Sequence, residues 1–357
     1  MLDQPQEGWS RLESAGDECR TRTARPVSRA APRARPAGIR EGSPSDRHWP
    51  FLDSTALSGR KRPDTAPPTV KLESADARVS QILPDGRLVR VHTHRITMDA
   101  DIVRKRFVSW SDGEADREWA GLTALARHVP GLAPAPISKE IEEGAPVVVM
   151  SRVPGAPLDT TRLTPAQVHA LAAALRRLFS VPVEPEVEER AFGPSVMRSF
   201  VREWAAESYD LHECRDPVLV GKALDLTRHW LASDDPTLDR VTDAVLARGD
   251  GNVENVMWDG SACRLIDFEE FGTSDIAYEL ADIVEHASSR LRGFLDVESL
   301  LDGMPLDAGQ RSRLAAFRRL MAAFWLVMLL PGNGGFGRNP AGSTEDQARH
   351  VIALLRR

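Results

Sequence analysis

Cysteine is scarce in this sequence, and no two cysteines have the spacing of a paired metal-binding or redox motif. The 357 residues include Cys19, Cys214 and Cys263, an odd number without a C-x-x-C pair. This pattern argues against a disulfide framework and against a zinc site. It favours a reducing compartment.

Long apolar runs are also missing. The longest, LMAAFWLVMLL at Leu320–Leu330, is well short of the roughly 20 residues that a membrane-spanning helix needs. The N-terminus has no apolar run of the kind found in signal peptides. These absences predict a cytoplasmic chain without a membrane partner.

The chain has no excess of positive charge. Lys and Arg number 46 against 52 Asp and Glu, which gives a formal net charge of −6. This balance argues against nucleic acid as a partner and mildly favours cationic partners. Hydrophobic residues make up 42% and charged residues 27%, as in globular proteins, and the length allows two domains or one two-lobed unit.

Residues 1–68 differ in composition from the rest. They are rich in Arg, Pro and Ala and have almost no apolar periodicity. Such a segment cannot bury enough surface to offset the entropy lost on ordering, so we predict a disordered N-terminal extension. A nucleic-acid-binding arm and an over-extended gene start are alternatives, although acidic residues are interspersed with the basic ones.

Residues 69–150 have strand-like patterns. The Asp-Gly pair in ILPDGRLVRV predicts a hairpin, and APVVVM at 145–150 predicts a short buried strand. Between them, a helix is expected to begin near Ser111 or Asp112. We therefore predict a small antiparallel sheet with one helix.

Residues 151–357 are predicted to be mostly helical after a connector rich in Pro and Gly. Thr164 is an N-cap candidate, with Pro165 at the first helical position. Apolar stripes at helical spacing predict core-facing helix sides at Val168, Leu171, Leu175 and Leu178, and at Leu314, Phe317, Met321, Phe324 and Met328. The fold class is therefore α+β.

Polar side chains that could bind a cation or transfer a proton are most concentrated in residues 247–270, ARGDGNVENVMWDGSACRLIDFEE. VMW, the turn DG and CRLI predict a hairpin that brings Asn255 close to Asp267, with Asp250 in the preceding loop. An amide oxygen and a carboxylate suit Mg²⁺, which leaves Asp250 free to accept a proton. An adhesion tripeptide, a surface hairpin with solvated acids, and a calcium loop are alternatives; the calcium loop would have Glu at position 261, where Ser261 stands.

A basic residue upstream adds an anion-binding group. In DIVRKRF the two-residue period of a strand places Val103, Lys105 and Phe107 on one face, so Lys105 is predicted to point inward. A nucleotide phosphate is the natural anion for it, and Glu118 on the next helix can hold it by ion pairing. Together with the 247–270 stretch, these residues form the phosphoryl-transfer arrangement of kinases.

On these motifs the chain resembles the aminoglycoside phosphotransferase family over roughly residues 75–335. RGDGNVEN matches the family's H-G-D-x-x-x-x-N motif, and DFEE matches its D-F-E motif. The resemblance implies a bilobal protein-kinase-like fold that uses ATP and Mg²⁺. It further implies that Asp250 is the catalytic base, that Asn255 and Asp267 are Mg²⁺ ligands, and that Lys105 contacts the α- and β-phosphates.

Two further segments resemble the family. MSRVPGAPL resembles its hinge, so the backbone at Met150 and Arg152 is expected to bind adenine. FGTSDIAYELAD resembles the helix after D-F-E. Its acidic residues Asp275, Glu279 and Asp282 could attract a cationic acceptor; a merely solvated helix face is the alternative.

Two departures from the family bear on activity. Arg248 stands where the family has His, and it either substitutes as a hydrogen-bond donor or distorts the loop. Only Gly86 offers the backbone freedom of a phosphate-cradling loop. The sequence predicts an ATP-dependent phosphotransferase acting on a hydroxyl of a small molecule, in which Arg248→His should keep or raise the rate. The alternative is a kinase-like protein that binds nucleotide or a partner without catalysis.

Overall fold

The computed structural model describes residues 94–108, 113–158, 162–233 and 236–356. Predictions for residues 1–93, which include the disordered extension and the hairpin at the Asp-Gly pair, lie outside the described residues. Within the described ranges, no helix combines the length and the apolar character needed to cross a membrane.

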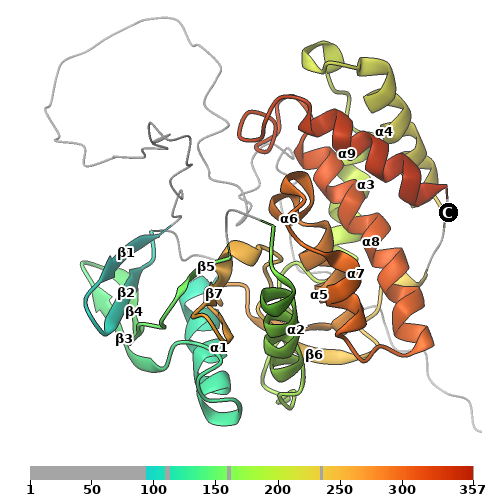
Figure 1. The fold of residues 1–357 in the computed structure, drawn as a ribbon. Helices are drawn as coiled ribbons and strands as arrows, with labels where there is room; N and C mark the ends of the chain where they lie inside the picture. The colour runs from blue at the N-terminus through green and yellow to red at the C-terminus, as the bar shows by residue number, and fades with distance from the viewer. Residues whose placement is uncertain (1–93, 109–112, 159–161, 234–235, 357) are drawn as a thin grey trace, which may run out of the picture. The chain divides into compact units, whose positions relative to one another are not determined.

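The described elements alternate between short strands and helices at first and are mostly helical later (Figure 1). In chain order they are β1 Arg95–Met98, β2 Ile102–Arg106, α1 Glu114–His128, β3 Pro136–Glu142, β4 Ala145–Ser151, β5 Ala156–Pro157, α2 Pro165–Phe179, α3 Pro194–Ala206, η2 Leu211–Glu213, α4 Pro217–Leu231, η3 Pro236–Leu238, β6 Ala244–Ala247, η4 Val253–Asn255, β7 Val256–Trp258, β8 Cys263–Leu265, β9 Gly272–Asp275, α5 Ile276–Glu285, α6 Ala287–Arg292, α7 Val297–Asp302, α8 Ala308–Met328 and α9 Ser343–Leu355.

The first sheet is antiparallel and has the order β1-β2-β4-β3, with helix α1 against one of its faces (Figure 1). That face is apolar: Phe107, Val148 and Met150 belong to one buried cluster with Leu122 and Leu125 of α1. The predicted APVVVM strand is confirmed as β4, which is buried along almost its whole length.

Strand β2 follows the predicted two-residue period. Lys105 is buried, with 5% of its surface exposed, whereas Arg104 and Arg106 are partly exposed. Arg104 donates hydrogen bonds to Glu140 and Glu142 on the outer face. The alternation therefore directs one cation inward and leaves the other two outside, as predicted.

Helix α1 begins later than predicted. Its first residue is Glu114 rather than a residue near Ser111 or Asp112. The cause is Gly113, whose φ of 84° is left-handed and cannot continue a right-handed helix toward the N-terminus. The proposed start residues themselves lie in 109–112, outside the described residues.

The helical part begins as predicted. The Thr164 hydroxyl accepts a hydrogen bond from the Gln167 N–H, and the Gln167 side chain accepts one from the Thr164 N–H, which forms a capping box with Pro165 at the first helical position. Every residue of both predicted apolar stripes, on α2 and α8, is buried. The predicted α+β class is thereby confirmed.

Two small antiparallel strand pairs flank the segments that carry Asp250, Asn255 and Asp267. Strand β7 pairs with β8, with Val256 opposite Leu265, which confirms the predicted hairpin. Strand β6 pairs with β9, with Ala247 opposite Gly272. The loop 248–255, which includes η4, connects β6 to β7, and the segment 266–271 connects β8 to β9, so these two connections lie side by side.

Candidate active site

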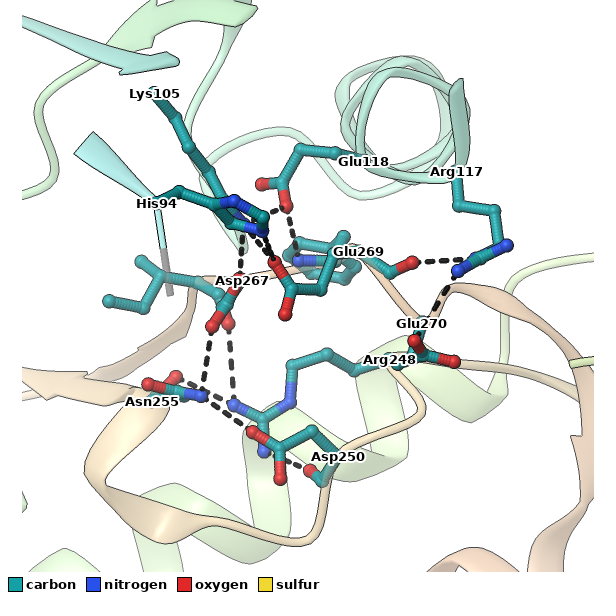
Figure 2. Close-up of polar contacts among 12 residues, drawn as sticks. His94, Lys105, Arg117, Glu118, Arg248, Asp250, Asn255, Asp267, Glu269 and Glu270 are labelled. Carbon is teal, nitrogen blue, oxygen red and sulfur yellow. Dashed lines mark hydrogen bonds and ion pairs between the residues drawn. The ribbon is translucent and has the colours of Figure 1, made fainter. Parts of the chain in front are cut away.

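The 248–255 loop places its polar side chains against Asp267 (Figure 2). The Asn255 side-chain amide donates to Asp250 Oδ2 at 2.6 Å and to Asp267 Oδ2 at 3.2 Å. The other Asp250 oxygen accepts from the Asn252 N–H at 2.9 Å. The hairpin thus brings Asn255 and Asp267 together as predicted, and Asp250 joins them through Asn255.

The close approach of the 248–255 loop to the 266–271 segment depends on a glycine. Gly249 has a φ of 87°, and a Cβ placed there would lie 2.1 Å from the backbone oxygen of Glu270. A larger residue would therefore be strained in conformation and would also collide with the 266–271 segment. This close approach sets how Asp250 meets Asp267.

Asp267 has an unusual backbone. Its φ is 70°, and among the described residues the only other non-glycine with positive φ is Glu143, in the turn before β4. A non-glycine residue in this region is strained and persists only where its surroundings hold it. Here Lys105 and Asn255 both bond the Asp267 carboxylate, and such locally stored strain is typical of functional sites.

The Lys105 ammonium lies among three carboxylates (Figure 2). Its Nζ is 2.9 Å from Glu118, 2.5 Å from Asp267 and 2.8 Å from Glu269. Burial alone would lower the pKa of Lys105, but Asp267, Glu118 and Glu269 raise it well above its ordinary value. The side chain is therefore a fixed cation at the centre of the site.

Glu118 links α1 to both functional segments. It is 1% exposed, and the same oxygen that binds Lys105 accepts a hydrogen bond from the Phe268 N–H at 2.9 Å. Burial raises the pKa of Glu118, and Lys105 opposes that shift. The predicted ion pair with Lys105 is present, and the same carboxylate also holds the backbone next to Asp267.

Two residues of this cluster were missed by the sequence analysis. Glu269 binds Lys105 and His94 Nε2, the latter at 2.8 Å. Burial would raise the pKa of Glu269, but Lys105 and His94 hold it well below its usual range. His94 Nδ1 accepts from the Val108 N–H, so its Nε2 carries the proton, and its ring packs on Phe107 at 4.5 Å.

The spacing of the DFEE motif contained a signal for Glu269. Glu269 is an acid only two positions after Asp267, so its closeness in the chain could have suggested it as a further oxygen donor at the same place. His94 had no such signal, because its contact with Glu269 joins positions 175 residues apart.

The carboxylate cluster has the donors of a hard cation site. Oxygens of Glu118, Asp267 and Glu269 all lie within 4.8 Å of one another. Three carboxylates against the Lys105 ammonium leave a formal charge of −2, which a divalent cation would balance. Asn255 turns its amide nitrogen toward the acids, so its oxygen would become a ligand after a half-turn of the amide group. This set fits Mg²⁺, which prefers oxygen ligands.

The residues expected at the hinge, Met150 and Arg152, lie at the end of β4 and directly after it. Met150 lies within β4, opposite Val103 on β2 and Pro136 on β3, and its side chain is in the buried cluster. The Arg152 N–H already donates to the Asp101 carbonyl at 2.7 Å. These contacts do not support an adenine contact through the Arg152 N–H, because that group is already bonded within the chain.

The expectation for the acidic residues of α5 was wrong for Asp275 and Glu279. Asp275 is fully buried, caps α5 at the Ala277 N–H, and pairs with Arg313 at 2.6 Å. Glu279 is 5% exposed and pairs with Arg190 at 2.6 Å. Each carboxylate is neutralised by an arginine of the chain, so these two neither face solvent nor attract an acceptor.

Asp282 is the member of that set that lies beside the loop. It is 8% exposed, and burial raises its pKa to about 7, with Asp250 adding to the shift. A Cβ at Gly251 would lie 2.7 Å from Asp282 Oδ1, so this carboxylate abuts the loop immediately after Asp250. Arg190 is 3.5 Å from its other oxygen.

The chain is similar in sequence to known phosphotransferases over the range that contains these site residues. A family model described as "Phosphotransferase enzyme family" (APH) matches residues 82–304, more than half of the chain and a range that includes every predicted site residue. Viomycin phosphotransferase from Streptomyces vinaceus is 29% identical over 198 residues, which cover 53% of this chain and 67% of that protein.

Solved structures of similar fold have low sequence identity. A choline/ethanolamine kinase family protein from Mesorhizobium loti has 15% identity and a TM-score of 0.49, with 73% of this chain and 85% of that chain covered. Spectinomycin phosphotransferase APH(9)-Ia, in complex with ADP and spectinomycin, has 14% identity and a TM-score of 0.46, with 74% and 92% covered.

Proposed function

Since the chain belongs to the phosphotransferase enzyme family (APH) and has a protein-kinase-like fold, we propose that it is an ATP- and Mg²⁺-dependent kinase of small molecules. It transfers the γ-phosphoryl group of ATP to a hydroxyl. The observation that carries this proposal is the convergence of Lys105, Glu118, Asp267 and Glu269, with Asp250 joined to them through Asn255.

Each residue has a task in this proposal. Lys105 binds the nucleotide phosphates, and Glu118 keeps its ammonium in place. Asp267 and Asn255 hold Mg²⁺, with Glu269 as a further oxygen donor. When bound, the ion neutralises negative charge on the phosphates.

Asp250 acts on the acceptor. Its two oxygens accept from the Asn252 N–H and the Asn255 amide, which fixes the carboxylate at the end of β6 while it stays partly exposed. A carboxylate so held can orient the acceptor hydroxyl and accept its proton as the oxygen attacks phosphorus. Asn255 therefore has two roles in this proposal: its side chain orients Asp250, and it also contacts Asp267.

The acceptor is proposed to be a small molecule, such as an antibiotic or an amino alcohol. The name of one relative supports an antibiotic as acceptor, since the protein that is 29% identical is viomycin phosphotransferase. Asp282 is buried beside the loop that carries Asp250 and pairs with Arg190, so it gives no separate support for a positively charged acceptor. We also propose that the enzyme acts in the cytoplasm, where thiols such as Cys214 and Cys263 stay unpaired.

The metal site is tested by ligand-dependent stability. ATP should raise the melting temperature of the wild type much more with Mg²⁺ than with EDTA, because a ligand that binds the native state stabilises it. Asp267→Asn should abolish that difference. Asp225→Asn, on the exposed side of α4, is the matched control and should behave as wild type. Equal stabilisation by ATP in all three proteins, with or without metal, would rule out this site.

The reaction is tested by screening acceptors for ATP consumption. A panel of aminoglycosides, macrolides, amino alcohols and sugars should contain at least one acceptor that raises consumption above the basal rate. If none does, while Mg²⁺-dependent binding of ATP persists, the chain is a kinase-like nucleotide-binding protein without transferase activity.

A further inference from the structure

Arg248 occupies the first position of the RGDGNVEN loop and is almost completely buried, with 6% of its surface exposed. Its Nη1 donates to the carbonyls of Asn255 at 2.9 Å and Ile266 at 3.3 Å. Its Nη2 donates to the carbonyls of Asn252, at 3.0 Å, and Asp250. One guanidinium therefore binds both connections, the 248–255 loop and the 266–271 segment (Figure 2).

The charge of Arg248 is unusual for a buried arginine. Among the described residues no carboxylate lies within ion-pair distance of it, and its hydrogen-bond partners are backbone carbonyls. Buried arginines in proteins usually pair with an acid, as Arg190 does with Glu279 here. The Arg248 guanidinium thus serves to bind several backbone carbonyls at once. It can do so because it has several N–H donors in one fixed plane.

A second arginine holds the same loop from the other side. The Arg190 side chain is fully buried, and it donates to the Gly249 carbonyl and to Glu279 on α5. The loop carbonyls at positions 249, 250, 252 and 255 therefore all accept from guanidinium groups. The orientation of Asp250 and Asn255 follows from this clamp, because their own carbonyls are among the bonded groups.

We propose that Arg248 is a positioning residue, which sets Asp250 and Asn255 against Asp267 by binding the carbonyls of both connections, and that the task requires a guanidinium. The inference rests on the proposed function. It reverses the sequence-based expectation for Arg248→His. A neutral imidazole has one N–H donor for four carbonyls, so the histidine found in the family cannot replace these contacts.

Replacing Arg248 should misalign Asp250 and Asn255 with Asp267, while the contact of Lys105 with the nucleotide is kept. A misplacement of about 1 Å can cost about 10²-fold in rate. Arg248→His and Arg248→Lys should therefore lower kcat by about 10²-fold. The KM for ATP should rise by a smaller factor, because Lys105 and Glu118 lie outside the loop and only the proposed Mg²⁺ ligand Asn255 lies within it. Lysine keeps the charge but not the planar set of donors, so it separates charge from geometry.

The experiment combines kinetics, chemical rescue and hydrogen exchange. Guanidinium chloride at millimolar concentration should restore part of the rate of Arg248→Ala, and it should not restore Asp250→Asn. The amides of Asn255 and Ile266, which donate to Asn252 and Asn255, should exchange faster in the Arg248 variants. Arg198→His is the matched control, since Arg198 is a buried arginine bonded to Asp239 and to the Ser233 carbonyl.

The outcomes separate this inference from the proposed function. Wild-type rate and wild-type amide exchange in Arg248→His would overturn the positioning role, as would the same loss of kcat in Arg198→His. If the wild type transfers phosphate to no acceptor, the proposed function fails by itself. Amide exchange then still decides the role of Arg248: faster exchange in the variants supports it, and unchanged exchange overturns it.

Discussion

Among single residues, Asp250 and Lys105 divide the two tasks that the proposed reaction needs. Lys105 is an interior cation whose charged form is stabilised by three carboxylates, and in the proposed reaction it would act before the chemical step by attracting phosphate. Asp250 is partly exposed and is oriented by two hydrogen bonds, so it acts when the acceptor hydroxyl attacks. The two side chains do not contact each other; Asn255 and Asp267 connect them.

This division predicts different kinetic effects for the two residues. Asp250→Asn should lower the rate of transfer by about 10²–10⁴-fold, the usual contribution of general acid–base catalysis. Its nucleotide affinity should stay near that of wild type, because a base contributes little to holding ATP. The measurements are steady-state transfer to the best acceptor and calorimetric binding of ATP.

Lys105→Met supplies the contrast, because it should weaken nucleotide binding as well as the rate. Lys139→Met is the control for it: Lys139 lies on β3 of the same sheet and pairs with Asp116 on α1, away from the site. If Asp250→Asn and wild type show the same residual rate over the whole acceptor panel, Asp250 is not the base.

At the scale of elements, α5 is fixed to its neighbours by a buried acid at its C-terminal end. Glu285 has no exposed side-chain surface, and it accepts from Arg318 on α8 at 2.7 Å and from His350 on α9 at 2.6 Å. Helix α5 also provides Asp282, which abuts the 248–255 loop. The packing of α5 on α8 and the Glu285 hydrogen bond to α9 thus hold in place the helix that abuts this loop.

Glu285→Gln is predicted to destabilise the fold by about 2 kcal/mol, within the range of about 1.5–3 kcal/mol for hydrogen bonds to charged groups, because Arg318 and His350 are partly exposed. Burial would raise the pKa of Glu285, but His350 and Arg318 lower it below its ordinary value. A depressed carboxyl pKa gives stability that is present above the unfolded value of about 4.3 and is lost as pH falls through the folded pKa. The gap between wild type and Glu285→Gln should therefore shrink below pH about 4. Denaturant unfolding at several pH values measures it, and a gap that stays constant down to pH 3 would contradict the assignment.

The elements also show which inferences the sequence allowed. The β7–β8 hairpin was predictable because its turn and its apolar runs are local in the chain. Glu279 was misassigned because helical periodicity tells which residues share a face but not what covers that face. Its partner Arg190 lies 89 positions earlier, in an irregular segment without a pattern. His94 was not predicted for the same reason, because its partner Glu269 lies 175 positions away in the chain.

In the molecule as a whole, the sheet and the helices share one apolar core. Phe107 and Leu122 on the sheet side belong to the same buried cluster as Phe268 within the DFEE motif, Phe271 directly after it, and Met328 at the end of α8. Lys105 and Asp267 are therefore brought together by continuous packing from both sides. The family resemblance predicted these distant site residues together because its motifs belong to one fold that packs them around this core.

Residues 1–68 are predicted to be dispensable. The prediction rests on their composition, and the family match is consistent with it because it begins only at residue 82. A chain that begins at Pro68 should have the melting temperature and the Mg²⁺-dependent ATP stabilisation of the full protein. A chain that begins at Arg95 is the contrasting control: it lacks His94, which binds Glu269 and packs on Phe107, and it should melt at a lower temperature. A large loss of stability in the chain from Pro68 would show that the N-terminal segment packs on this core.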